Sequence, residues 1–188
     1  MTSKIRAFIA LPISPEIRTD IASLQAQLIA TDAAVKWEAH EKFHITLKFL
    51  GDIESSQVDP LAAAIRKSIG GSSPFEIAYV TLGGFPNVDR PRVVWIGARE
   101  NEHIQSLQRH VEEACVSNGF AKEEHPFHAH ITLGRVKGIR NLDRLTAKLK
   151  SITFQPLMAR CSEVRLMRSE LKPTGSAYTL LNSIPLAS

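Results

Sequence analysis

The sequence predicts an α+β protein of two pseudo-symmetric lobes, each an antiparallel-rich sheet with helices on its outer face, lining a central cleft. Strand-like and helix-like segments alternate without a glycine-rich phosphate loop or a dinucleotide-binding fingerprint. The tetrad His-Ile-Thr-Leu begins at His44 and again at His130, 86 residues later, close to half of the 188 residues. Because no linker or low-complexity segment separates the halves, we expect residues 1–188 to form a single bilobal domain.

The first half of the chain predicts the order β-α-β-β-α. Strands are expected over residues 6–11, 35–37 and 43–50, and helices over residues 15–29 and 58–69. The first helix has apolar side chains at helical spacing from Ile17 to Leu28, and Ser14, which precedes a proline, suits its N-cap. Gly51 and Asp52 are expected to end the third strand.

The second half predicts more strands than helices. Strands are expected over residues 75–82, 92–98, 127–136, 152–158, 163–170 and 178–184, and helices over residues 104–116 and 142–149. A turn-rich loop is expected over residues 83–87. Trp37 and Trp95 are interpreted as core side chains in preference to surfaces on which a base would stack.

Composition fits a chain that folds without staples in a reducing compartment. Hydrophobic residues make up 44% of the sequence, enough for a sizeable core. The two cysteines, Cys115 and Cys161, have no paired spacing and indicate neither a disulfide framework nor a thiolate metal site. The N-terminus lacks the layout of a signal peptide, and no apolar run is long enough to span a membrane. We therefore expect a cytoplasmic protein, with a monomer as the default.

The net charge of +4 suits an anionic partner, but only weakly. The 23 basic and 19 acidic residues are mixed along the chain without long basic blocks. A solvated surface of mixed charge explains the composition better than a nucleic-acid partner does, so any functional inference must rest on the positions of particular residues.

The two tetrads give those positions. Successive side chains of a strand point to opposite faces, so His44 and Thr46 share one face of their strand while the intervening isoleucine and leucine bury the other. The same holds for His130 and Thr132. Two imidazoles and two hydroxyls are thereby offered to one site. The alternative, that these residues decorate a half-buried sheet, would suit a single tetrad better than a repeated one.

With these motifs the chain resembles the RNA 2′,3′-cyclic phosphodiesterases of the two-histidine (2H) phosphoesterase superfamily, also called 2′-5′ RNA ligases. The resemblance covers nearly the whole length and is carried by residues 6–11, 43–51, 84–87, 92–97, 130–135 and 168–171. Two departures precede the tetrads. Family members often have Arg-Pro or Lys-Pro before the second histidine, where this chain has residues 126–129, Pro-Phe-His-Ala. The family's Val-Pro-Pro-Glu-Asn-Leu-His stretch is replaced by residues 37–44.

The resemblance implies metal-independent hydrolysis of RNA 2′,3′-cyclic phosphate ends to 2′-phosphomonoesters, with no cofactor. His44 would be the proton donor to the leaving oxygen and His130 the proton acceptor that activates water. The residue types suit this chemistry, because in-line displacement at phosphorus needs an acid and a base on opposite sides. The substrates would be RNA or nucleotides that end in a cyclic phosphate, and the reverse reaction would join RNA through a 2′-5′ bond.

The remaining candidates surround the two histidines. Thr46 and Thr132 can donate hydroxyl hydrogen bonds to the non-bridging phosphate oxygens. Arg135 can add a charge-assisted contact to the phosphate, although strict alternation points it away from His130, so a twist at the strand end would have to redirect it. Phe49 is a candidate for stacking on the terminal base, but a core position is the favoured interpretation.

Two other interpretations stay open. His125, His128 and His130, near Glu123 and Glu124, raise the possibility of a metal site, but no His-Glu-x-x-His motif or aspartate-rich companion supplies further ligands. The second alternative is a module that binds RNA ends or nucleotides without turnover. An acid and a base would then serve no purpose, so the sequence favours the enzyme.

Overall fold

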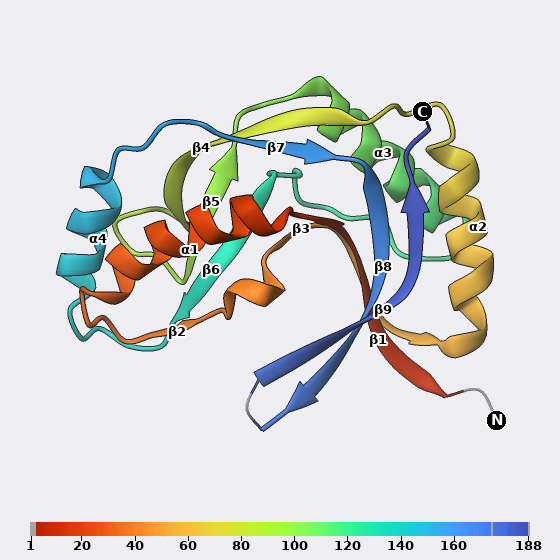
Figure 1. Cartoon of the computed structure of the whole chain (residues 1–188). Helices are drawn as coiled ribbons and strands as arrows, with labels where there is room; N and C mark the ends of the chain where they lie inside the picture. The colour runs from red at the N-terminus through yellow and green to blue at the C-terminus, as the bar shows by residue number, and fades with distance from the viewer. Residues whose placement is uncertain (1–2, 174, 188) are drawn as a thin grey trace.

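The computed structural model describes residues 3–173 and 175–187, and in it nine strands form one strongly curled sheet. The strand order is β7-β4-β5-β6-β3-β1-β8-β9, and β2 pairs with β6 beside this path. Each pairing among the described residues is antiparallel. The tip of the β8–β9 hairpin projects from the sheet (Figure 1).

The strands are β1 (Lys4–Pro12), β2 (Val35–Trp37), β3 (His44–Glu54), β4 (Phe75–Phe85), β5 (Val93–Ala98), β6 (His130–Val136), β7 (Leu157–Cys161), β8 (Glu163–Lys172) and β9 (Gly175–Pro185). The helices are α1 (Pro15–Ile29), α2 (Val58–Ser68), α3 (Glu102–Ser117) and α4 (Leu142–Ser151), with short 3₁₀ turns η1 (His40–Lys42) and η2 (Ser55–Gln57). The α+β class, the repeated lobes and the antiparallel pairing are as the sequence predicts.

The sheet is symmetric about the junction of β3 and β6, where Ile45 faces Ile131. Outward from this junction, β1 beside β3 corresponds to β5 beside β6, β8 corresponds to β4, and β9 corresponds to β7. The two predicted sheets are therefore joined into one by the two strands that carry the tetrads. The sheet itself holds the two histidine motifs side by side.

Each lobe takes one helix from each half of the chain. Helix α1 packs with α4 and β7, and helix α2 packs with α3 and β9. Figure 1 shows α1 and α4 at one end of the sheet and α2 and α3 at the other. Because each lobe contains one helix from the first half of the chain and one from the second, neither half of the sequence forms a lobe by itself.

Several predicted strand boundaries are wrong, and the structure gives a reason for each. Strand β3 runs through Gly51, which adopts a left-handed φ of 71° opposite Ala7, instead of ending there. Residues 83–85 extend β4 and do not form a loop, because Gly83 lies beneath the indole of Trp95, where a Cβ would be 2.4 Å from the ring. Strand β7 begins only after Pro156, whose nitrogen cannot donate to the sheet.

Strand β6 also begins later than predicted, at His130 instead of residue 127. Its partner β5 ends at Ala98, and Gly97 faces His130, so the pairing with β5 ends at the hydrogen bond from the Ala98 amide to the Ala129 carbonyl oxygen, at 2.9 Å. The second histidine therefore stands at the first residue of its strand, as His44 does in β3. Both imidazoles lie where a loop enters the sheet.

The buried hydrophobic side chains form one cluster that extends from the helices to the strands of both lobes. Ile17, Ile21 and Leu28 of α1 are buried, and the Ser14 hydroxyl caps the helix by accepting from the Ile17 amide at 3.4 Å, as predicted. Cys115 and Cys161 are buried free thiols, and burial raises the pKa of each to about 12. Within the described residues, no helix is long and apolar enough to cross a membrane.

Candidate active site in the central cleft

A cleft of about 460 Å³ runs over the junction of β3 and β6 and contains all six residues proposed from the sequence. They are His44, Thr46, Phe49, His130, Thr132 and Arg135. Strand β1, strand β9 and the segment between α3 and β6 supply the other walls. The structure thus brings the two halves of the predicted site together, with one tetrad on each of two adjacent strands.

The register of the junction places each histidine across from the threonine of the other tetrad. Ile45 and Ile131 are partners, and in an antiparallel pair the residues on either side follow in opposite directions. His44 is therefore opposite Thr132, and Thr46 is opposite His130. The four polar side chains occupy the corners of one small quadrilateral, while the isoleucines between them are fully buried on the other face.

A backbone carbonyl fixes the tautomer of each imidazole. Nδ1 of His44 lies 2.6 Å from the Lys42 carbonyl oxygen, and Nδ1 of His130 lies 2.7 Å from the His128 carbonyl oxygen. A carbonyl can only accept, so each Nδ1 carries the hydrogen and each Nε2 is left for chemistry. Nε2 of His44 lies 3.0 Å from Oγ1 of Thr46. In both tetrads the carbonyl comes from the residue two positions earlier.

The same β-bulge occurs in both motif strands, just after the threonine. The register pairs are Thr46–Ala10 and Lys48–Ile9 around the extra residue Leu47, and Thr132–Trp95 and Gly134–Val94 around the extra residue Leu133. An extra residue inverts the alternation beyond it. Phe49 and Arg135 are consequently turned to the face that carries the histidines.

The bulge explains the two candidates that simple alternation left unsettled. Arg135 lines the cleft, and the cause is the bulge at Leu133, so the expected twist at the strand end is wrong as a mechanism. Phe49 is 66% exposed at the cleft, so its alternative assignment to the core is wrong as well. The repeat therefore continues past the tetrads. Phe49 and Arg135 occupy equivalent positions in the two motif strands, so one lobe has an aromatic ring where the other has a guanidinium group.

A glutamine from a helix holds each bulge. Gln25 of α1 is buried, and its Nε2 donates to the carbonyl oxygens of Leu133, at 2.9 Å, and Glu38, at 2.8 Å. Gln108 of α3 donates to the carbonyl oxygen of Leu47 at 3.5 Å. A bulge disrupts the regular backbone pairing, and each glutamine adds a hydrogen bond to a carbonyl of the bulged residue. The contact in β6 is the tighter of the two.

Burial lowers the pKa of both imidazoles below the usual histidine value. Desolvation is the main cause at each residue, and the carbonyl bonded to Nδ1 opposes it. The pKa of His44 is lowered further by His130, and the pKa of His130 is lowered further by His128 and Arg135. Without a bound anion, both rings are therefore predominantly neutral at pH 7.

Two aromatic residues of the cleft were not identified as site residues from the sequence. Tyr178 of β9 meets the His44 ring edge-on, with centroids 5.5 Å apart, and Phe8 of β1 lies 4.9 Å from the same ring. Burial, reinforced by the charge of Glu38, raises the pKa of the Tyr178 hydroxyl. These rings hold His44 from the side opposite the junction. Neither residue is near a tetrad in the sequence, so only the strand order could have found them.

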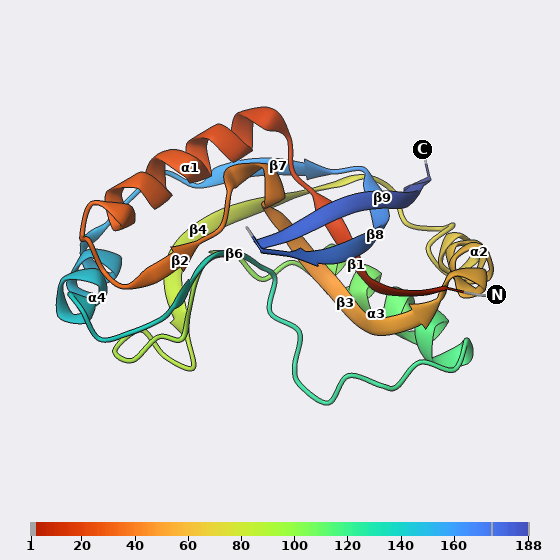
Figure 2. The same cartoon turned by 90° about the horizontal axis from the view of Figure 1, so that it is seen from below.

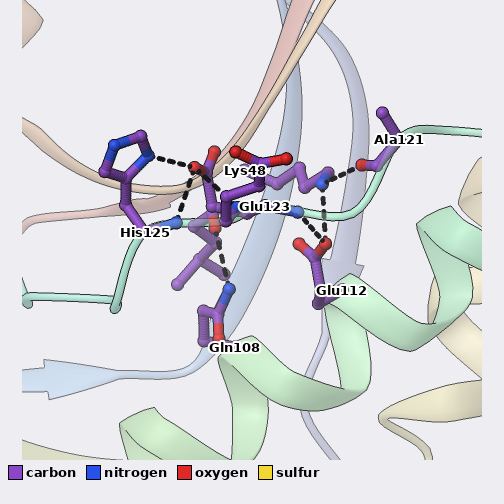
Figure 3. Close-up of polar contacts among 8 residues, drawn as sticks. Lys48, Gln108, Glu112, Ala121, Glu123 and His125 are labelled. Atoms are coloured by element: carbon purple, nitrogen blue, oxygen red, sulfur yellow. Dashed lines mark hydrogen bonds and ion pairs between the residues drawn. The ribbon is translucent and has the colours of Figure 1, made fainter.

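A buried ion pair ties one wall of the cleft to the first motif strand. Nζ of Lys48 donates to Oε1 of Glu112 at 2.7 Å and to the Ala121 carbonyl oxygen at 2.6 Å, as Figure 3 shows. The same Oε1 accepts from the Glu123 amide at 2.8 Å. Lys48 thereby anchors the otherwise irregular segment between α3 and β6, which runs along the side of the molecule in Figure 2.

Two further histidines, His125 and His128, lie in this wall of the cleft. His125 is exposed, and its Nδ1 lies 3.0 Å from Oε1 of Glu123. His128 lines the cleft and contributes the carbonyl that orients His130. Among the residues that the structure describes, no three His, Cys, Asp or Glu side chains gather closely enough to hold a metal ion.

The curled sheet, its two lobes and the paired tetrads define a phosphoesterase-type fold. The crystal structure of E. coli LigT complexed with 3′-AMP has a TM-score of 0.78 to this chain, at 24% identity, over 99% of this chain and all of that one. The likeness to that structure establishes the common fold.

The chain belongs to the family of LigT-like phosphoesterases, whose model matches twice, over residues 11–95 and 96–178. Each match contains one tetrad. Several relatives carry the name RNA 2′,3′-cyclic phosphodiesterase. The protein from Methanothermobacter thermautotrophicus is 38% identical over 94% of this chain and 96% of its own length. The protein from Aeropyrum pernix is 34% identical over 89% of this chain and 96% of its own length.

Proposed function

We propose that this protein hydrolyses RNA 2′,3′-cyclic phosphate ends to 2′-phosphomonoesters by paired-histidine acid–base catalysis, without a metal. The observation that carries the proposal is the pair of imidazoles in one cleft, each with Nδ1 bonded to a backbone carbonyl, so that Nε2 is the nitrogen that can exchange a proton with a substrate. The Thr46 hydroxyl, which is 3.0 Å from Nε2 of His44, would turn to the phosphate when a substrate binds. Membership of the family and two relatives named for this reaction support it. A mere phosphate binder would not need two oriented imidazoles of this kind.

In the proposed mechanism, Nε2 of His130 accepts a proton from water as the water oxygen attacks phosphorus. The bond from phosphorus to the ribose O3′ breaks, and O3′ takes a proton from Nε2 of His44. The product keeps its phosphate on O2′. The hydroxyls of Thr46 and Thr132 donate to the non-bridging oxygens, and Arg135 adds a charge-assisted contact to the same group. Phe49 offers an exposed ring to the terminal base.

The lowered pKa values fit this division of labour. A neutral imidazole is needed as the base, and burial keeps His130 in that form at neutral pH. The acid must be protonated, and the negative charge of a bound cyclic phosphate raises the pKa of the nearby His44. Substrate binding thus supplies the charge that places a proton on the acid.

The same groups can join two RNA ends when a 5′-hydroxyl takes the place of water. The hydroxyl would give its proton to His130 and attack the phosphorus of the 2′,3′-cyclic phosphate, the bond to O3′ would break, O3′ would take a proton from His44, and a 2′-5′ linkage would remain. Water at high concentration favours hydrolysis. We therefore propose 2′-5′ joining as a secondary reaction of the same site.

The wider setting follows from the same features. We propose that the partners are RNA or nucleotides with cyclic phosphate ends, that no cofactor takes part, and that residues 1–188 work as a single bilobal domain and a monomer. The two buried free thiols fit a reducing, cytoplasmic compartment.

Replacing the two histidines singly tests the proposed function. His130→Ala and His44→Ala should each lower kcat for an oligoribonucleotide with a cyclic end by about 10²–10⁴-fold, the range typical of a lost general acid or base. His103→Ala is the matched control, because His103 is exposed on α3 and does not line the cleft. Its activity should equal that of the parent. Binding of the oligonucleotide without turnover by the parent protein would overturn the proposal in favour of a binding module.

A further inference from the structure

A second cavity, of about 320 Å³, lies directly behind His44. Phe8, Lys42, His44 and Tyr178 line both this cavity and the catalytic cleft. These four side chains therefore form a partition with a space on each side. The volume of the second cavity is close to the roughly 300 Å³ at which small-molecule sites begin.

The lining of the second cavity is apolar on one side and cationic on the other. Its apolar side chains include Ile13, Phe43 and Met167, together with the rings of the partition. Three cations, Arg18, Lys42 and Arg165, face one carboxylate, Glu41. Glu41 lies 3.1 Å from Nε2 of His40, and the guanidinium of Arg165 is bonded to Glu163. This lining therefore suits a ligand that has both a flat apolar group and an anionic group.

Arg18 has hydrogen-bonding capacity that the described residues leave unused. Its Nε is buried and has no hydrogen-bond partner among them. Its Nη2 reaches the Ile13 carbonyl oxygen only at 3.5 Å, the limit of a hydrogen bond. A buried donor without a partner is costly, and a guanidinium binds phosphate oxygens through parallel donors. Arg18 is therefore the group of this cavity that is best prepared for a phosphate.

We propose that the second cavity binds the penultimate nucleotide of the RNA, with its phosphodiester on Arg18 and Lys42 and its base on the apolar wall. The inference rests on the proposed function in one respect. If His44 protonates the leaving ribose oxygen, the terminal ribose lies on the His44 side of the phosphorus. The chain that continues from its 5′ position then reaches the far side of the partition. The cavity would make the enzyme prefer RNA ends over free cyclic nucleotides.

The proposal is tested by comparing a nucleoside 2′,3′-cyclic phosphate with a dinucleotide that ends in the same group. The dinucleotide should have a kcat/KM at least about tenfold higher in the parent protein, which corresponds to about 1.4 kcal/mol. Arg18→Ala should lower this ratio toward one, and Arg18→Lys should restore part of it. Lys67→Ala removes the same charge on α2, outside both cavities, and should leave the ratio unchanged.

A second variant keeps the test independent of Arg18. Met167→Trp should fill the cavity and lower the ratio in the same way, because Met167 lies on its apolar wall and is only partly buried. Circular dichroism and the melting temperature would show that both variants fold. Equal kcat/KM for the two substrates in the parent protein would overturn the proposal, as would an equal loss for both substrates in Arg18→Ala.

Product binding separates this proposal from the proposed function. The dissociation constants of a nucleoside 2′-phosphate and of the dinucleotide with a 2′-phosphate end can be measured by calorimetry whether or not turnover occurs. Tighter binding of the dinucleotide, lost in Arg18→Ala, supports the second site even in a protein without activity. Equal affinities with normal turnover would leave the proposed function standing and remove the second site.

Discussion

Replacing Gln25 by Met removes the side chain that holds the bulge in β6. Gln25 is 6% exposed and donates to the Leu133 and Glu38 carbonyl oxygens at 2.9 and 2.8 Å. Methionine has a similar length, so the loss is mainly two hydrogen bonds at about 1 kcal/mol each. The Leu133 oxygen keeps the Glu38 amide, which donates to it at 2.9 Å. We expect the free energy of unfolding to fall by about 2 kcal/mol.

Urea denaturation of Gln25→Met and Gln108→Met measures the effect against a matched control. Gln108 occupies the corresponding place in the other lobe but makes one long contact to Leu47, so its loss should cost under about 0.5 kcal/mol. The bulge at Leu133 also directs Arg135 into the cleft, so Gln25→Met should lower kcat/KM about tenfold. Equal losses of stability in the two variants, or unchanged kcat/KM in Gln25→Met, would refute this account of the bulge.

Three further outcomes are expected. The plot of kcat/KM against pH should peak below about pH 6.5 and fall at higher pH. Burial lowers the pKa of both imidazoles, and the histidine that acts as the acid loses its proton above its pKa. An optimum above pH 7 would contradict this prediction. Lys48→Met should lower the free energy of unfolding by about 3 kcal/mol by stranding buried Glu112, and adding Glu112→Leu should recover most of it in urea titrations. Phe49→Ala should raise KM for oligonucleotides without lowering the melting temperature, because Phe49 is exposed at the cleft; a lowered melting temperature would mean that it packs as a core residue.

Local patterns in the sequence were enough to predict most of the fold. The helix from Pro15 to Ile29 has the predicted bounds because its cap and its apolar spacing are both local signals. Some of the strand boundaries that failed depend on partners elsewhere in the chain, as at Gly83 beneath Trp95 and at the start of β6. The exchange of helices between the lobes could not be predicted either, because it is decided by the packing of whole elements.

For the candidate site, the sequence identified the two tetrads because they repeat. It did not reveal the bulges at Leu47 and Leu133, since an extra residue in a strand is defined only by the strand opposite. The direction of Arg135 was therefore left unexplained. Tyr178 could not be predicted as a residue of the site for the same reason, because only the order of the strands brings the Tyr178 side chain of β9 beside His44.

The product of the reaction tests the central proposal most directly. Purified protein would be given an oligoribonucleotide that ends in a 2′,3′-cyclic phosphate, with EDTA present, and the product would be identified by mass and by phosphatase-coupled chromatography. Proton donation from His44 to O3′, with water activated at His130 and no metal involved, predicts a 2′-phosphate end. A 3′-phosphate end, or turnover that appears only when a metal is added, would contradict the proposed mechanism.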